Sequence, residues 1–280
     1  MSRAPSLSKP LVIKVGGAVL DDAASLARML DAVAMMHRSR PGSVVLVHGG
    51  GAAIERALAA LGMATTKRHG IRVTPSEQVP VIAGVLGGTV NARIVSGLLA
   101  RGVTAQGMRL LDGGLARCDR VDPSLEVGEV GCVVGGNPTV VRSILASGAL
   151  PVIASIGATA SGDLLNVNAD DAAAALVSVL GARGLALLTD VAGVRGPDGA
   201  VAAQLDAARI EEWIALGIIH GGMVPKVKGA LAASAASGAP VTIASWQDAD
   251  ALAALAHGRS AGTTIACPTH AATQPQKVTS

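Results

Sequence analysis

Residues 11–51 read LVIKVGGAVLDDAASLARMLDAVAMMHRSRPGSVVLVHGGG, and this stretch decides the fold class. Two short apolar runs, Leu11–Val15 and Val44–Val47, enclose a longer segment that is rich in alanine and leucine, Asp22–Arg38. Apolar runs without in–out alternation are typical of strands that are buried on both faces of a parallel sheet. The stretch therefore predicts two parallel strands that are joined by a helix and end in glycine turns.

The same alternation continues outward from this unit. Ala52–Leu61 is a second helical segment, the short apolar run Pro151–Ile153 precedes the helical segment Ala169–Leu180, and Leu185–Leu188 is another strand-like run. Strands that alternate with helices in this way predict a three-layer α/β/α sandwich with a mostly parallel central sheet.

The chain is expected to form one domain, because no linker rich in glycine, serine or proline divides it. Two lobes are expected, an N-lobe at about residues 11–181 and a C-lobe at about residues 182–266. Within Arg117–Val134, two short strands flank a turn at Asp122-Pro-Ser and predict a β-hairpin flap. Residues 267–280 lack apolar periodicity and are expected to be a flexible tail.

The composition argues against nucleic-acid and membrane partners. The chain has two Trp and no Phe or Tyr, so it lacks the aromatic platforms on which bases stack, and its net charge is only +3. The uncharged stretches Ser143–Gly162 and Gly229–Gln247 are interrupted by glycine, proline, serine and threonine, so neither predicts a membrane span. The first residues lack the long apolar segment of a signal peptide, and a cytoplasmic location is expected.

Common catalytic and nucleotide signatures are missing from the sequence. No Gly-Lys pair exists, so there is no Walker A loop, and Ile54 stands where a dinucleotide fingerprint needs its last Gly or Ala. Two strands instead end in Lys14-Val-Gly-Gly17 and His48-Gly-Gly-Gly51. Such turns expose backbone N–H groups that can cradle an anion, although a tight turn that needs positive φ would also select glycine.

Charged and amide side chains stand beside several such turns. Lys14 lies within an apolar run, so its ammonium is expected to reach the carboxyl end of the sheet, where α/β proteins bind ligands. The segment Asn166-Val-Asn-Ala-Asp170 could supply helix caps or could organise an ion. Thr189-Asp-Val-Ala-Gly193 could flank a nucleotide, and Lys226 stands near a helix N-terminus, where the helix dipole disfavours a cation unless it serves an anionic ligand.

Seven of these motifs occur in the order seen in the amino acid kinase family, which the chain resembles over about Leu11 to Ala266. They are Lys14-Val-Gly-Gly17, His48-Gly-Gly-Gly51, Gly70-Ile-Arg-Val-Thr74, Gly88-Thr-Val-Asn91, Asn166-Val-Asn-Ala-Asp170, Thr189-Asp-Val-Ala-Gly193 and Gly222-Met-Val-Pro-Lys226. The segment Ile243-Ala-Ser-Trp246 is similar to the short, dimeric bacterial branch of the enzymes that phosphorylate N-acetyl-L-glutamate. In one departure, Met108-Arg-Leu-Leu-Asp112 replaces a Leu-Ser-Gly-x-Asp pattern of the wider family.

The resemblance implies that the γ-phosphoryl group of ATP is transferred to the side-chain carboxylate of N-acetyl-L-glutamate, in arginine biosynthesis. It further implies a homodimer and a Mg²⁺ ion that is held by ATP phosphates and water, with no protein ligand. Only ten residues, including Pro5 and Pro10, precede the first strand, so the helix that links dimers of arginine-sensitive relatives is not expected. A kinase for carrier-bound or N-acetylated α-aminoadipate and a non-catalytic amino-acid sensor are the alternatives.

The resemblance also assigns roles to individual residues. Lys14 and Lys226 would stabilise transition-state charge, with Asp170 holding both lysines. Arg72 would form a bidentate fork on the α-carboxylate of acetylglutamate, and His48 would be structural rather than a base. Gly16, Gly17 and Gly49 would donate N–H groups along the phosphoryl path, whereas Gly50, Gly51, Asn166 and, more weakly, Asn168 would bind acetylglutamate. The ATP-binding residues would be Asp190, Val191, Ala192, Gly193, Val194, Arg195, Ile218, Ile219 and His220.

Overall fold

The central element of the fold is an eight-stranded sheet with the strand order β12-β14-β13-β11-β1-β2-β8-β5. The computed structural model describes residues 9–68 and 70–266, and the predicted tail at 267–280 lies outside them. The strands of this sheet are β1 (Leu11–Val15), β2 (Val44–His48), β5 (Ala105–Arg109), β8 (Leu150–Ala154), β11 (Gly184–Thr189), β12 (Gln204–Leu205), β13 (Val241–Ser245) and β14 (Thr263–Ile265). Only β13 and β14 pair antiparallel in it, which confirms the mostly parallel sheet.

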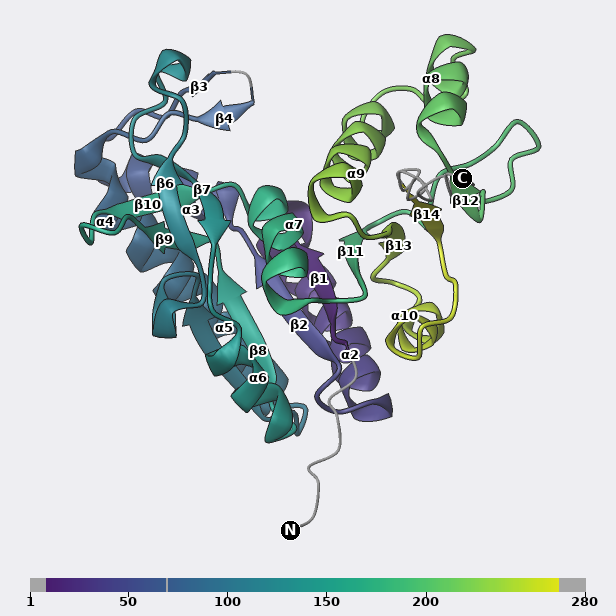
Figure 1. Ribbon diagram of the computed structural model, residues 1–280, viewed down its shortest axis with the longest axis horizontal. Helices are drawn as coiled ribbons and strands as arrows, with labels where there is room; N and C mark the ends of the chain where they lie inside the picture. The colour runs from purple at the N-terminus through teal and green to yellow at the C-terminus, as the bar shows by residue number, and fades with distance from the viewer. Residues whose placement is uncertain (1–8, 69, 267–280) are drawn as a thin grey trace, which may run out of the picture.

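Helices cover both faces of this sheet (Figure 1). One face carries α2 (Ala23–Ser39), α5 (Asn91–Leu99) and α10 (Ala249–Ala256), and the other carries α6 (Thr139–Ala146), α7 (Ala169–Leu180), α8 (Ala207–Ala215) and α9 (Met223–Ser237). Successive residues of β1 face opposite layers, since Val12 packs with the α7 side and Ile13 with the α2 side. Both faces of the strand are therefore apolar, and the three-layer sandwich is confirmed.

A second, four-stranded sheet contains the predicted flap. Its order is β6-β7-β10-β9, with β6 (Arg117–Arg120), β7 (Val130–Gly135), β9 (Ile156–Ala158) and β10 (Leu164–Val167). The hairpin of β6 and β7 was expected, but β9 and β10 were not, and neither was the small hairpin of β3 (Lys67–Arg68) and β4 (Ile71–Arg72). These strands are two to four residues long, too short to produce a recognisable run in the sequence.

Further helices flank these sheets: α1 (Ala18–Asp21), α3 (Gly51–Ala60), α4 (Val79–Ala83), the 3₁₀ turns η1 (Ser76–Gln78), η3 (Asp112–Gly114) and η4 (Pro123–Leu125), and the π-helical segment η2 (Gly84–Val90). Residues Ser76–Leu99 form a single apolar helical run of 24 residues, and its most apolar 18-residue window has a mean hydropathy of 1.4. In the described chain this is the one helix long and apolar enough to cross a membrane by length and composition, a test that core helices of globular proteins also pass. One side of it, including Ile82, Leu86 and Ile94, is buried in the protein.

Candidate active site

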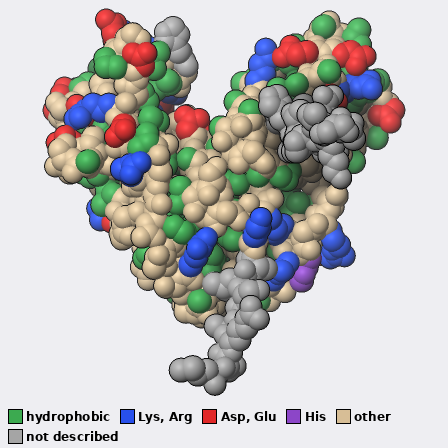
Figure 2. All heavy atoms as spheres, in the orientation of Figure 1, with side chains coloured by type: hydrophobic (Ala, Val, Ile, Leu, Met, Phe, Trp, Pro, Cys, Tyr) green, Lys and Arg blue, Asp and Glu red, His purple; other side chains and the backbone are tan. Residues whose placement is uncertain are grey.

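A cleft of about 1090 Å³ opens at the carboxyl ends of β1 and β11. Figure 2 shows the corresponding notch between two lobes of the molecule. Lys14, Asp170 and Lys226 all line this cleft, together with Gly16 and Gly17. Parallel strands bring their carboxyl ends to one edge of a sheet, which explains how these distant residues meet. Three residues predicted to serve the phosphoryl group are therefore brought together by the fold.

Lys14 and Asp170 form an ion pair inside the cleft. The Nζ atom of Lys14 lies 3.0 Å from Oδ1 of Asp170 and 3.1 Å from Oδ2, and the lysine side chain is only 18% exposed. Asp170 is held in the first turn of α7, whose N-cap is Asn168. The Asn168 Oδ1 atom accepts hydrogen bonds from the backbone N–H groups of Asp170 and Asp171 at 2.8 and 3.2 Å. Asn168 lines the cleft, but its side-chain oxygen is already used as a cap.

Asp170 was expected to hold both lysines. In the structure it pairs with Lys14, whereas Lys226 has other partners. The Nζ atom of Lys226 donates to Oγ1 of Thr189 at 2.9 Å and lies 3.3 Å from Oδ1 of Asp190. Lys226 stands in the first turn of α9 beside the end of β11, so the nearest carboxylate comes from its own lobe. The Thr189 hydroxyl, with smaller help from Lys226, lowers the pKa of Asp190. Each lysine therefore faces the cleft with its own carboxylate.

A second cavity adjoins this cleft. It has a volume of about 340 Å³ and is lined by Val201, Met223 and the nine predicted nucleotide residues, Asp190, Val191, Ala192, Gly193, Val194, Arg195, Ile218, Ile219 and His220. Asp190 lines both spaces, so the cavity lies next to the cleft. The volume falls in the usual range for small-molecule sites, about 300 to 1,000 Å³.

Arg72 lies beside Gly51, one of the glycines predicted to bind acetylglutamate. Its side chain is 8% exposed, and its Nη2 atom donates to the Gly51 carbonyl at 3.1 Å and to Oε1 of Glu55 at 2.8 Å. The Nη1 atom is buried, and none of the described residues offers it a hydrogen-bond partner. Nη2 is therefore already engaged, and Arg72 does not line the cleft of about 1090 Å³. Of the two terminal nitrogens of the predicted bidentate fork, only Nη1 is therefore without a partner among the described residues.

Thr74 joins Arg72 to Asn166. The Thr74 hydroxyl donates to the Arg72 carbonyl at 3.1 Å and accepts from Nδ2 of Asn166 at 3.1 Å, and the residue is fully buried. Because this bond engages one side of the Asn166 amide, Thr74 fixes its direction. Thr74 stands in one of the seven motifs, but its role was not predicted, since a hydroxyl's partners cannot be read from sequence spacing.

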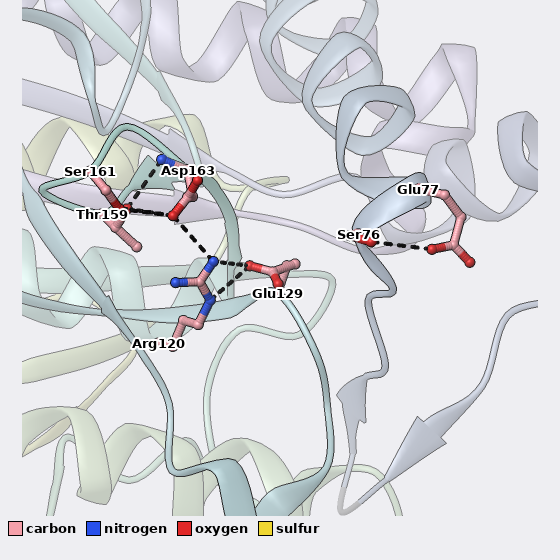
Figure 3. A network of polar contacts seen from close by, with 7 residues as sticks. All are labelled: Ser76, Glu77, Arg120, Glu129, Thr159, Ser161 and Asp163. Atoms are coloured by element: carbon pink, nitrogen blue, oxygen red, sulfur yellow. Dashed lines mark hydrogen bonds and ion pairs between the residues drawn. The ribbon is translucent and has the colours of Figure 1, made fainter.

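The main chain of Glu129 lies between Thr74 and Asn166 and bonds to both. Its N–H donates to the Thr74 carbonyl at 2.7 Å, and its carbonyl accepts from the N–H of Asn166 at 3.0 Å. Figure 3 shows the Glu129 side chain bonded to Arg120, which also reaches Asp163. The closest of these N–O distances is 2.8 Å. Exposed pairs contribute little singly, but this network ties β6 to the residue before β7 and to the turn before β10.

His48 closes the second strand as a buried, neutral side chain. It is fully buried, and burial lowers its pKa from 6.5 to about 4. Its Nδ1 atom lies 2.9 Å from the Gly49 carbonyl and its Nε2 atom 3.0 Å from Nδ2 of Asn91. A neutral ring that donates from Nδ1 and accepts at Nε2 satisfies both contacts. In this geometry His48 supports the glycine turn. Both of its ring nitrogens are hydrogen-bonded, so neither is free for proton transfer.

A model of the amino acid kinase family matches residues 9–245 of the chain. The chain is 43% identical to the acetylglutamate kinase of Vibrio cholerae over 254 residues, which are 91% of this chain and 96% of that protein. It is also 43% identical to the acetylglutamate kinase of Aeromonas salmonicida, over 91% of this chain and 97% of the relative.

Solved structures of other enzymes share the fold. Carbamate kinase from Giardia lamblia bound to AMP-PNP has a TM-score of 0.61 and 20% identity, covering 92% of this chain and 98% of its own. N-acetylglutamate synthase from Neisseria gonorrhoeae, complexed with coenzyme A and N-acetyl-glutamate, has a TM-score of 0.72 and 22% identity, covering 92% of this chain and 59% of its own. At such identities the likeness shows the fold alone.

Proposed function

The chain belongs to the amino acid kinase family, and we propose that it transfers the γ-phosphoryl group of ATP to the side-chain carboxylate of N-acetyl-L-glutamate, in arginine biosynthesis. Acetylglutamate kinases that are 43% identical over nearly their whole length support this reaction. The observation that carries the assignment within the structure is the convergence of Lys14 and Lys226 on one cleft. The product is an acyl phosphate, with ADP released.

The reaction needs positive charge more than it needs a base. The acceptor carboxylate is ionised at neutral pH and is already a nucleophile. One of its oxygens forms a bond to the γ-phosphorus while the bond from that phosphorus to the β–γ bridging oxygen breaks, and the electron pair leaves with ADP. Lys14 and Lys226 stabilise the charge on the two ends of this path, and Asp170 keeps Lys14 in place. The N–H groups of Gly16 and Gly17, which line the cleft, complete the phosphoryl site. Gly49 was also expected to donate there, but its N–H already donates to the Val15 carbonyl at 3.4 Å.

Mg²⁺ fits this site as an ion that arrives with ATP. The described residues contain no group of three or more His, Cys, Asp or Glu side chains that could hold a metal. The carboxylates of Asp170 and Asp190 already pair with Lys14 and Lys226. When bound, Mg²⁺ would take its ligands from phosphate and water and would neutralise phosphate charge.

The two substrates occupy different lobes in this proposal. The N-lobe, residues 11–181, binds acetylglutamate through Gly50, Gly51, Arg72 and Asn166. The C-lobe, residues 182–266, binds ATP in the cavity of about 340 Å³. The unpartnered Nη1 atom of Arg72 supports an anionic acceptor group, because a buried donor without an acceptor is costly. Dependence on ATP favours the cytoplasm as the place of action.

A homodimer completes the proposal. Only 33% of the most apolar window of the Ser76–Leu99 helix is buried in the single chain. Leu99, at the end of this helix, is a large apolar side chain that is 52% exposed, and a second copy that packs there would bury it. Light scattering tests this directly, with a mass of twice 27.6 kDa expected and a monomer as the opposing result.

The reaction is tested by trapping the acyl phosphate with hydroxylamine. Acetylglutamate, glutamate and acetylaminoadipate are compared side by side with ATP and Mg²⁺. Hydroxamate is expected from acetylglutamate at the highest kcat/KM. Preference for acetylaminoadipate would make the chain a kinase of lysine synthesis, and no hydroxamate from any acceptor would support a sensor without catalysis.

A further inference from the structure

Glu55 contacts Arg72, the arginine proposed to bind the acceptor. It lies on α3 (Gly51–Ala60), and its Oε1 atom is 2.8 Å from Nη2 of Arg72. The hydrogen bond from Arg72 is the main reason that the pKa of Glu55 is lowered. The glutamate side chain is 44% exposed, whereas the arginine is 8% exposed. A partly solvated carboxylate therefore pairs with a buried guanidinium.

A buried guanidinium needs this partner. Removing a cation from water is costly unless it is paired and hydrogen-bonded, and an arginine side chain cannot avoid this cost by losing its proton. Glu55 and the Gly51 carbonyl engage Nη2, and no partner engages Nη1. Because guanidinium is planar, fixing one terminal nitrogen fixes the direction in which the other points.

We propose that Glu55 is a positioning residue for the acceptor carboxylate: it holds the Arg72 guanidinium so that Nη1 is presented to the α-carboxylate of acetylglutamate. This inference rests on the proposed function. The carboxylate of the acceptor then finds a donor already oriented, and binding does not have to include the ordering of a long side chain.

Glu55 has a second contact that offers a different explanation. Its Oε1 atom lies 3.5 Å from Nζ of Lys67 on β3, so it could act only by docking the β3–β4 hairpin. Lys67 is 58% exposed, and a pair so solvated contributes little. Lys67→Ala therefore separates the two roles, since it removes this contact and leaves the bond between Glu55 and Arg72 intact.

The test measures steady-state kinetics of the full chain with acetylglutamate and ATP. Glu55→Ala is expected to raise KM for acetylglutamate about ten-fold, with kcat and KM for ATP changed by less than about three-fold. Glu55→Gln, which keeps an acceptor oxygen but loses the charge, should fall between Glu55→Ala and wild type. Lys67→Ala should stay within about two-fold of wild type in every constant.

A double-mutant cycle then tests whether Glu55 acts through Arg72. In an Arg72→Ala background, Glu55→Ala should change KM for acetylglutamate by less than about two-fold, because the residue being positioned is gone. Equal effects with and without Arg72 would overturn the proposal. So would an unchanged or lower KM in Glu55→Ala, or a ten-fold rise in Lys67→Ala.

Two controls keep the result interpretable. If Glu55→Ala does not fold, judged by its circular dichroism and its KM for ATP, Glu55→Gln decides: a raised KM for acetylglutamate supports the proposal and an unchanged one overturns it. The wild-type assay comes first, since absence of acetylglutamate phosphorylation there would reject the proposed function itself and not the role of Glu55.

Discussion

Replacing Lys14 by methionine should lower kcat about a thousand-fold. The Nζ atom lies 3.0 Å from Asp170 in a side chain that is only 18% exposed, so water screens it incompletely. At an effective dielectric constant of about 20, a unit charge about 4 Å from another contributes about 4 kcal/mol. That energy corresponds to a factor of about a thousand in rate. Methionine keeps an unbranched chain in the β1 layer while removing the charge.

The assay follows ADP release at saturating ATP and acetylglutamate, and hydroxamate formation checks that phosphoryl transfer is being followed. KM for acetylglutamate should change by less than about three-fold, because Lys14 acts on charge that develops in the transition state. A kcat within about ten-fold of wild type would refute the role given to Lys14. A large rise in KM with kcat unchanged would place the lysine in substrate binding instead.

Three further outcomes are expected. Lys226→Met should lower kcat by at least about ten-fold, since its side chain is 41% exposed, while the control Lys228→Met, two positions along α9, should leave kcat unchanged. Arg72→Lys should raise KM for acetylglutamate about ten-fold and leave KM for ATP unchanged, because an ammonium cannot replace the guanidinium geometry; a change confined to ATP would contradict this. The pKa of His48 is lowered from 6.5 to about 4 and that of His37 is also lowered, both by burial, so the unfolded chain binds more protons as pH falls below 6.5. In urea unfolding, the contribution of His48 alone should lower the free energy of unfolding by about 2 kcal/mol between pH 7.5 and pH 5. A free energy of unfolding that stays constant over this range would contradict the prediction.

The central part of the fold could be predicted because its signals are local. The run Leu11–Val15 becomes β1 with the same bounds, and Ala169–Leu180 becomes α7 with the same bounds. The strands are continuous apolar runs, and α7 ends at Gly181, which adopts the left-handed conformation at φ 61°. The nine nucleotide residues meet in one cavity because they form two short stretches of sequence, Asp190–Arg195 and Ile218–His220.

The pairing of charges could be predicted only in part, since it depends on distances between distant segments. The pair of Lys14 with Asp170, 156 positions away, was expected from the family resemblance, whereas the pair of Lys226 with Asp190, 36 positions away, was not. Glu55 and Thr74 were given no role for the same reason. A glutamate on an exposed helix face looks like any solvated glutamate until the fold brings a buried arginine against it.

Direct attack of the acceptor carboxylate on ATP is tested most directly by tracing an oxygen atom of that carboxylate. Acetylglutamate labelled with ¹⁸O in its side-chain carboxylate is incubated with the enzyme, ATP and Mg²⁺, and the acyl phosphate is cleaved with hydroxylamine at its carbonyl carbon. Direct attack by the carboxylate predicts that the phosphate released carries one ¹⁸O, seen as an isotope shift in its ³¹P NMR signal. Phosphate without ¹⁸O would show that water, and not the acceptor carboxylate, had taken the phosphoryl group.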